Sequence, residues 1–321
     1  MKDEKLLEIK NLSIQYKTDD GVVHAVENLN LEVGNGETLG FVGETGAGKT
    51  TTALGVLQLV PEPAGKIVGG EIFFQGENLL DKNRNEMKKI LGKKIAMIFQ
   101  DPMTSLNPVM TVGDQIKEMI LLHENVSNSE ASEKAREILE VVGIPGERQD
   151  EYPHQFSGGM KQRVVIAIAL SCNPTLLIAD EPTTALDVTI QAQVLDLMKN
   201  LKEEFQTSMI MITHDLGVVA DICDKVAIMY GGNVLEYATK ESLFTKAYHP
   251  YTQGLFNSIP DLDDEQDRLN VIDGLPPDPT DMPSGCSFHP RCPHAMDKCS
   301  ECAPPKFEVA PGHTVNCYLY E

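Results

Sequence analysis

The sequence contains no tryptophan, few other aromatic residues and no long apolar run. Aromatic residues make up 6% of the 321 residues, and no stretch approaches the ~18 apolar residues that a membrane-spanning helix needs. The first residues, Met1–Lys5, lack the apolar segment of a signal peptide. The 41% hydrophobic fraction still suffices for a buried sheet flanked by helices. We expect a soluble cytoplasmic protein of two structural units that reaches a membrane only through partners.

Positive charge is also scarce. The chain has 27 lysine and arginine residues against 48 aspartate and glutamate residues, which gives a net charge of −21. A surface that binds nucleic acid should be basic, and direct contact with anionic lipid also needs basic residues. The charge balance therefore disfavours both partners.

The clearest motif is a phosphate-binding loop of the pattern G-x-x-x-x-G-K-[ST]. It follows an apolar strand predicted at residues 38–42 and precedes a helix predicted from residue 49, which is the expected strand-loop-helix context. Glycines allow successive N–H groups to converge on phosphate oxygens, Lys49 would neutralise the β- and γ-phosphates, and the Thr50 hydroxyl suits Mg²⁺. The predicted nucleotide-binding residues are Gly43, Glu44, Thr45, Gly46, Ala47, Gly48, Lys49, Thr50 and Thr51.

A short apolar run, residues 176–179, ends in the two acids Asp180 and Glu181. Such a run is typical of a buried strand in a parallel sheet. Acids at its carboxyl end fall on the rim where ligands bind in open α/β sheets. We expect Asp180 to hold Mg²⁺, through water, and Glu181 to polarise the attacking water. The alternative is a pair of solvated acids after a strand.

Three further candidate ligand-binding sites lie next to predicted helices or strands. Ser157, Gly158 and Gly159 precede a helical run predicted at residues 160–170, where a hydroxyl and two amides form an anion site at a helix N-terminus. Alone, such a sequence is more often an N-cap and turn. Gln100 follows the apolar run 95–99, and His214 follows an apolar strand predicted at residues 209–212.

In this order the motifs resemble those of the ABC ATPases. The resemblance implies that Ser157, Gly158 and Gly159 grip the γ-phosphate of ATP held by an opposite subunit, so that two subunits clamp two ATP molecules. Gln100 matches the glutamine that contacts the metal and senses the transmembrane partner, and His214 matches the histidine that hydrogen-bonds the γ-phosphate. Residues 184–187 resemble the loop that crosses the dimer interface.

Tyr16 lies between two strands predicted at residues 6–16 and 22–33. Its position resembles that of the family's aromatic residue that stacks on adenine, and such stacking is physically sound. The alternative is a strand tyrosine packed against a neighbour.

The resemblance implies an α/β fold, the P-loop NTPase ABC cassette, with a mixed core sheet, an antiparallel β subdomain and a helical subdomain. We place the cassette at residues 1–258, with the helical subdomain at about 101–170, and a Cys-rich C-terminal extension at residues 259–321. The extension begins with an acidic, proline-rich stretch that cannot continue a regular element. Helices are predicted at 112–123 and 129–142. This region has no sustained heptads, unlike the cassettes of chromosome-maintenance ABC ATPases.

Residues 98–108 and 249–252 resemble the dipeptide and oligopeptide importer ATPases, and residues 103–105 resemble the "D" subunit of such systems. This resemblance implies an ATPase that powers peptide import from the cytoplasmic face of the membrane as a peripheral subunit. Its implied partners are a second homologous ATPase subunit in a heterodimer, two membrane-spanning permease subunits and, indirectly, an extracytoplasmic peptide-binding protein. The alternatives are the ATPase of a nickel or other small-solute importer, a soluble ABC ATPase acting on nucleic acid or ribosomes, and a non-hydrolysing sensor module.

Five of the seven cysteines lie within 32 residues near the C-terminus. In a reducing cytoplasm such a cluster more often binds metal than forms disulfides. Cys299 and Cys302 have the spacing of half a zinc site, but no second C-x₂-C pair completes it. Cys172 and Cys223 lie in apolar segments and are expected in the core.

Residues 285–317 resemble the C-terminal segment of peptide-importer ATPases, which carries a [4Fe–4S] cluster in members with all four cysteines. The implied ligands are Cys286, Cys292, Cys299 and Cys317, and the role implied for the cluster is structural. Cys302 falls where the family does not require cysteine. Zinc, and no metal at all, remain the alternatives.

Overall fold

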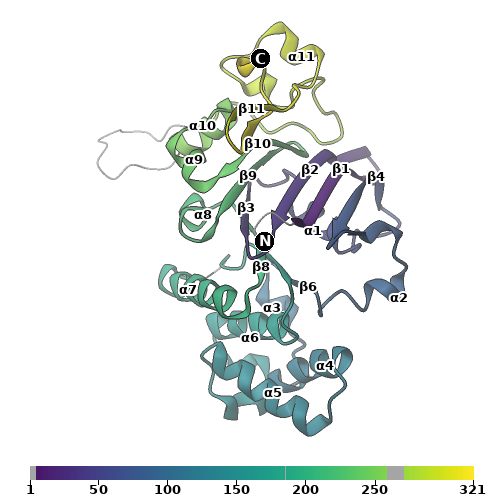
Figure 1. Cartoon of the computed structure of the whole chain (residues 1–321), viewed down its shortest axis with the longest axis vertical. Helices are drawn as coiled ribbons and strands as arrows, with labels where there is room; N and C mark the ends of the chain where they lie inside the picture. The colour runs from purple at the N-terminus through teal and green to yellow at the C-terminus, as the bar shows by residue number, and fades with distance from the viewer. Residues whose placement is uncertain (1–4, 185, 259–270) are drawn as a thin grey trace. The chain divides into compact units, whose positions relative to one another are not determined.

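The computed structural model describes residues 5–184, 186–258 and 271–321 (Figure 1). Within them the chain forms two compact units. Of the described residues, the first comprises 34–38, 81–184 and 186–212, and the second comprises 5–33, 39–80, 213–258 and 271–321. In the described part of the chain, no helix is long and apolar enough to cross a membrane.

The first unit is built on parallel strands in the order β8-β7-β6. Their bounds are Ile95–Ile98 for β6, Leu176–Asp180 for β7 and Ser208–Thr213 for β8. Every residue of β7 is buried, as expected for a parallel strand covered on both faces. The register aligns Ile98 with Ala179 and Asp180 with Ile212. The carboxyl ends of β6 and β7 therefore lie on the same edge of the sheet. The predicted site residues Gln100 and Glu181 come just after these strand ends.

Helices make up the rest of the first unit: α2 (Arg84–Met87), α3 (Pro102–Ser105), α4 (Val112–His123), α5 (Asn128–Val141), α6 (Gly158–Leu170) and α7 (Val188–Phe205). The structure confirms the helix predicted at 112–123. The helix predicted at 129–142 begins and ends one residue earlier, because Ser127 and Glu130 form a capping box at its start. The helix predicted from residue 160 begins at Gly158, since the Ser157 hydroxyl is its N-cap.

The second unit contains an antiparallel pairing of β1 with β4 in the strand order β2-β1-β4-β5. These strands are β1 (Lys5–Thr18), β2 (Gly21–Gly34), β4 (Gly65–Phe74) and β5 (Glu77–Asn78). The first strand is predicted to end at residue 16, but it ends two residues later, at Thr18. Tyr16 consequently lies inside β1 and not between two strands, which corrects that part of the prediction.

The remaining strands of the second unit follow the order β3-β9-β10-β12-β11. They are β3 (Thr38–Val42), β9 (Lys225–Tyr230), β10 (Asn233–Thr239), β11 (Phe307–Ala310) and β12 (His313–Val315). β3 and β9 are parallel, whereas β9, β10, β12 and β11 pair antiparallel. The predicted mixed α/β architecture of the cassette is therefore confirmed, and the strand predicted at 38–42 is found there.

The helices of the second unit are α1 (Lys49–Val56), α8 (Leu216–Ile222), α9 (Lys240–Thr245), α10 (Pro250–Asn257) and α11 (Asp297–Glu301). The C-terminal segment joins this unit through β12, in which Val315 pairs with Glu236 and Thr314 pairs with Tyr237 of β10. Phe288 and Val315 are buried. The predicted start of the extension, residues 259–270, lies outside the described residues.

Candidate functional site

The phosphate-binding loop connects β3 to α1, and its geometry depends on two glycines. A Cβ at Gly43 would lie 2.1 Å from the Met229 carbonyl oxygen, and one at Gly48 would lie 2.2 Å from the Ala25 carbonyl oxygen. Gly48 also has φ of 102°, in the left-handed region that other residues rarely adopt. No side chain could occupy either position without moving the backbone. The tight loop therefore exists because these two residues are glycine.

Lys49 lies inside this loop. Its side chain is buried, and its ammonium group donates to the carbonyl oxygens of Gly43 (2.7 Å) and Glu44 (3.0 Å). The hydroxyl-bearing Thr50 is exposed in the first turn of α1, and α1 has no side-chain N-cap. A helix start without a capping side chain leaves backbone N–H groups for an anion. The loop and Lys49 thus have the chemistry of a phosphate site.

Glu181 and Gln100 come together at the carboxyl ends of β7 and β6. The Gln100 Nε2 donates to Glu181 Oε2 over 2.8 Å, and the Thr184 hydroxyl donates to the same oxygen over 3.0 Å. Asp180, directly before Glu181, is buried. Glu181 has φ of 45°, while its N–H donates to the Ile212 carbonyl oxygen (2.9 Å). Strained backbone of this kind is concentrated at functional sites and costs about 1–3 kcal/mol.

The hydroxyl of Thr184 is a partner of Glu181 that the sequence does not reveal. The motif pattern marks Thr184 only as part of the loop at 184–187. In the structure, Thr184 is the first residue of that loop and Asp187 is the N-cap of α7, accepting from the Ile190 N–H. Ala185 lies outside the described residues. A hydroxyl three residues after a carboxylate in a turn is the signal that could have indicated this contact.

Ser157 is the N-cap of α6, where its hydroxyl accepts from the Met160 N–H over 3.4 Å. Gly159 allows α6 to approach α7 closely, because a Cβ there would lie 2.4 Å from Ile190 Cγ2. The preceding Phe156 is buried, with the Arg148 guanidinium 4.4 Å from its ring centre. The serine and glycines are thus held at a rigid helix start, with a hydroxyl and backbone N–H groups available to an anion.

The other two predicted nucleotide contacts lie in the second unit. Tyr16 is half-buried and pairs with Gly65 across β1 and β4. A Cβ at Gly65 would come within 2.6 Å of the Tyr16 ring, so the ring packs over that glycine. His214 follows β8 and is exposed, next to Asp215, which caps α8. Both side chains are partly or fully accessible to a ligand.

Four of the C-terminal cysteines line one cavity: Cys286, Cys292, Cys299 and Cys317. Burial raises the pKa of Cys286 to about 11 and raises the pKa of Cys292 and Cys317 as well. Cys302 is exposed and does not line the cavity. Among the described residues, no three His, Cys, Asp or Glu side chains are grouped to hold a metal ion. Of the two cysteines expected in the core, Cys223 is buried and Cys172 is half-buried.

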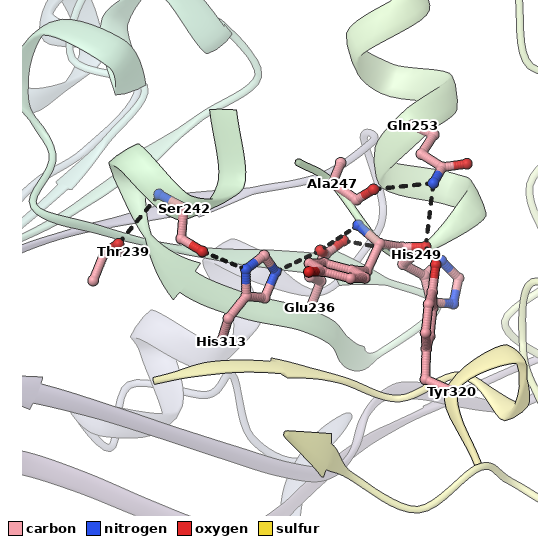
Figure 2. A network of polar contacts seen from close by, with 9 residues as sticks. Glu236, Thr239, Ser242, Ala247, His249, Gln253, His313 and Tyr320 are labelled. Atoms are coloured by element: carbon pink, nitrogen blue, oxygen red, sulfur yellow. Dashed lines mark hydrogen bonds and ion pairs between the residues drawn. The ribbon is translucent and has the colours of Figure 1, made fainter. Parts of the chain in front are cut away.

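A buried hydrogen bond between His313 and Glu236 joins this C-terminal segment to β10 (Figure 2). His313 and Glu236 are fully buried, with His313 Nε2 2.7 Å from Glu236 Oε1 and His313 Nδ1 2.7 Å from the Ser242 hydroxyl. The N–H groups of Tyr248 and His249 also donate to the carboxylate, over 2.7 and 3.0 Å. Burial opposes ionisation of Glu236, but these hydrogen bonds lower its pKa below the usual value.

The Cys-lined cavity receives its other wall from the start of α10. His249 is buried, its Nδ1 accepts from the Tyr251 N–H, and its ring lies 5.8 Å from that of Phe288. Burial lowers the pKa of His249 to about 4, so this imidazole is neutral at physiological pH.

Sequence reasoning missed both Glu236 and His313, because a single acid in a short strand predicts exposure to solvent.

Residues 26–184 match the sequence profile of the ABC transporter family, and residues 235–299 match the C-terminal region of oligopeptide/dipeptide transporters. The chain is 51% identical to the oligopeptide transport ATP-binding protein AppD of Bacillus subtilis, over 98% of this chain and 97% of that protein. It is 50% identical to the oligopeptide transport ATP-binding protein OppD of Escherichia coli, over 98% and 93%. For the dipeptide transport ATP-binding protein DppD of Bacillus subtilis the identity is 48%, over 99% and 96%.

The structure is similar to that of the ATP-binding cassette MJ0796 in a dimeric, post-hydrolysis state bound to ADP and Pi, with a TM-score of 0.66 and 28% identity over 73% of this chain and 98% of that one. It is also similar to cbiO1 of Clostridium perfringens, part of an ABC transporter complex, with a TM-score of 0.66 and 27% identity over 76% and 92%. The chain therefore belongs to the ATP-binding subunits of oligopeptide and dipeptide ABC transporters, and it is an ATPase.

Proposed function

We propose that this chain hydrolyses ATP to power the import of dipeptides or oligopeptides through a membrane ABC transporter. The observation that carries this proposal is the contact between Gln100 and Glu181 at the ends of adjacent parallel strands. It supplies a carboxylate held by an amide and a hydroxyl, at the rim where phosphate chemistry occurs in such sheets. The nearly full-length similarity to peptide transport subunits supports the choice of cargo.

Each residue then has a defined task in binding or orientation. The loop amides and Lys49 bind and neutralise phosphate oxygens, and Glu181 orients the attacking water and accepts its proton. We propose Thr50, Gln100 and Asp180 as ligands of Mg²⁺, because this ion prefers oxygen ligands; when bound it would neutralise phosphate charge. Tyr16 stacks on adenine, and His214 hydrogen-bonds the γ-phosphate.

We propose a composite site shared with a second, homologous ATPase subunit. Ser157, Gly158 and Gly159 would contact ATP bound by that companion, whose own serine and glycines would complete this chain's site. The assembly would contain two permease subunits and act with an extracytoplasmic peptide-binding protein. In this arrangement the chain is a peripheral subunit on the cytoplasmic face of the membrane.

We propose a [4Fe–4S] cluster in the C-terminal segment, because four cysteines line one cavity and four thiolates are the ligands that such a cluster needs. Burial raises the pKa of three of these thiols, so their ionisation requires compensation by positive charge, which bound iron supplies. In such a cluster each thiolate binds a different iron atom, so the four cysteines need not be grouped around a single metal ion. We propose Cys286, Cys292, Cys299 and Cys317 as the ligands of a structural cluster. Iron and sulfide analysis of anaerobically purified protein tests this, with about four irons per chain expected. Stoichiometric zinc would refute it.

The transport proposal is tested with the complete transporter reconstituted in vesicles. Magnesium-dependent ATP hydrolysis should be stimulated by a peptide-loaded binding protein, and labelled peptide should accumulate only when ATP is present. Nickel ions test the alternative of a small-solute importer, and a labelled oligonucleotide tests the alternative of an ATPase that acts on nucleic acid. Transport of nickel without peptide, or tight binding of the oligonucleotide at physiological salt, would contradict the proposal.

A further inference from the structure

Glu44, the first variable residue of the phosphate-binding loop, is held by two residues from the C-terminal part of the second unit. Its backbone N–H donates to the Tyr251 hydroxyl over 3.0 Å. Its carboxylate accepts from Arg291 Nη1, over 3.2 Å at Oε1 and 2.9 Å at Oε2. The side chain of Arg291 is only 7% exposed and that of Glu44 is 25% exposed. This ion pair is therefore screened by water and salt far less than a surface pair.

The direction of the Arg291 guanidinium is fixed by its other contacts. Nη1 also donates to the Tyr230 hydroxyl (3.2 Å), Nε donates to the Asp273 carbonyl oxygen (3.0 Å), and Nη2 donates to the Ile272 carbonyl oxygen (3.3 Å). A planar guanidinium with partners on several sides cannot rotate to follow a moving carboxylate. Arg291 is thus a fixed point that determines where Glu44 lies.

The backbone of Arg291 belongs to the turn between two of the cavity cysteines. It lies in the 3₁₀ turn His289–Arg291, directly before Cys292. The Arg291 N–H donates to the Phe288 carbonyl oxygen over 3.0 Å, and the turn begins three residues after Cys286. Anything that holds the thiols of Cys286 and Cys292 therefore also holds the backbone that carries Arg291.

Packed aromatic rings connect the same cavity to the loop. Phe288, which lines the cavity, lies 5.2 Å from the Tyr230 ring and 5.3 Å from the Tyr251 ring, and the two tyrosine rings lie 4.6 Å apart. All three side chains are buried. Close-packed rings transmit displacement instead of absorbing it. A shift of the cysteine segment would therefore reach the hydroxyl that accepts the Glu44 N–H.

We propose that the cysteine-rich segment positions the phosphate-binding loop through Arg291 and Tyr251, so that the affinity for ATP depends on whether the four thiols are held. The dependence on the thiols rests on the cluster proposed above. An unheld Glu44 carboxylate would repel the phosphates that the loop binds, and a loosened loop would lose conformational entropy on binding ATP. Arg291 is a positioning residue, because it acts through Glu44.

The first test measures the Kd for Mg-ATP on the full chain. Arg291→Ala should weaken binding about 5- to 50-fold, within the range of coupling between linked sites. In the assembled transporter the KM for ATP should rise correspondingly, with a smaller change in kcat. The matched control is Lys298→Ala, which removes an exposed ion pair with Glu321 in the same segment. That variant should bind ATP with the wild-type Kd.

A double-mutant cycle separates positioning from general loss of structure. If Arg291 acts by restraining the Glu44 carboxylate, Glu44→Gln should make the further change Arg291→Ala nearly silent for ATP affinity. Should Arg291→Ala fail to fold, Tyr251→Phe removes only one hydroxyl and should still weaken binding about 2- to 10-fold. Wild-type affinity in both Arg291→Ala and Tyr251→Phe overturns the proposal, as do additive effects in the cycle.

Metal analysis distinguishes failure of this proposal from failure of the cluster. Cys292→Ser should lose iron and weaken ATP binding about as much as Arg291→Ala, whereas Arg291→Ala should keep its iron. Loss of iron in Cys292→Ser with unchanged ATP affinity overturns the link to the thiols. Wild-type protein without iron overturns the cluster and with it that link, while the titrations of Arg291→Ala and Tyr251→Phe still decide whether the segment positions the loop.

Discussion

Replacing Glu236 by glutamine tests the buried hydrogen bonds that join β10 to the C-terminal segment. Glu236 is fully buried, and its carboxylate accepts from His313, Tyr248 and His249. Glutamine has the same size but only one acceptor oxygen. Its amide nitrogen would therefore face one of these N–H donors, and the two backbone donors cannot turn away.

The magnitude follows from the hydrogen bonds that glutamine cannot make. A hydrogen bond to a charged group contributes about 1.5–3 kcal/mol, and leaving a buried donor unsatisfied costs about 1–3 kcal/mol. Removing a buried charge recovers part of this through lower desolvation, so we expect a net loss of about 3–5 kcal/mol, typical of breaking a buried pair. Because 1 kcal/mol shifts the thermal midpoint by about 2–4 °C in a unit of this size, the midpoint should fall by at least ~6 °C.

The pH dependence of unfolding provides a second readout. Since hydrogen bonds lower the pKa of Glu236 in the folded state, its contribution to stability is fully present above the ordinary glutamate pKa of about 4.3. It is lost as the pH falls through the lower, folded pKa. The difference between wild type and Glu236→Gln should therefore shrink as the pH falls below ~4.5.

Urea unfolding followed by circular dichroism at several pH values measures both effects. The control is Glu241→Gln, an exposed glutamate in the first turn of α9, which should change stability by less than ~1 kcal/mol. If Glu236→Gln unfolds like the control at neutral pH, or if its deficit persists unchanged in acid, the ionised carboxylate does not stabilise the fold through these hydrogen bonds.

Three further predictions concern the ATP site. Glu181→Gln should retain ATP binding and folding but lose hydrolysis about 10²- to 10⁴-fold in the assembled transporter, and near-normal turnover would contradict the role given to Glu181. Tyr16→Ala should weaken ATP binding by about 1–3 kcal/mol, whereas Tyr16→Phe should keep the wild-type affinity. An equal loss of affinity in both variants would instead favour a structural role for Tyr16, packed on Gly65. Ser157→Arg should leave ATP binding by the isolated chain unchanged but abolish turnover in the complex, and weakened binding in isolation would argue against a site shared between subunits.

Local patterns predicted the elements that carry the site. The apolar run 38–42 is β3, and the helix predicted at 112–123 is α4, because both depend on periodicity and on signals within a few residues. Phosphate-loop glycines were predictable for the same reason. The predicted end of β1 falls two residues early, since Lys17 and Thr18 have no apolar alternation to mark them as strand.

Contacts between distant residues could not be predicted in this way. Arg291 and Glu44 are separated by 247 positions, and His313 and Glu236 by 77. Nothing in the composition of either segment indicates its partner. The positive φ of Glu181 was equally hidden, because a motif gives residue types and not backbone angles. The sequence therefore predicts which residues do chemistry better than it predicts which residues hold them.

The boundary placed at residue 258 follows composition, whereas the contacts of the second unit argue that folding does not stop there. β12 pairs with β10, the His313 imidazole contacts a carboxylate buried in β10, and Arg291 binds Glu44 of the phosphate loop. A chain ending at residue 258 would retain Glu236 without its imidazole and Glu44 without its guanidinium. Glu236 would keep the Tyr248 and His249 N–H donors but lose the His313 contact in a fully buried position, and Glu44 would lose its ion pair in the loop that binds phosphate. We therefore expect such a truncation to lose stability and ATP affinity together, so the C-terminal segment completes the nucleotide-binding unit rather than decorating it.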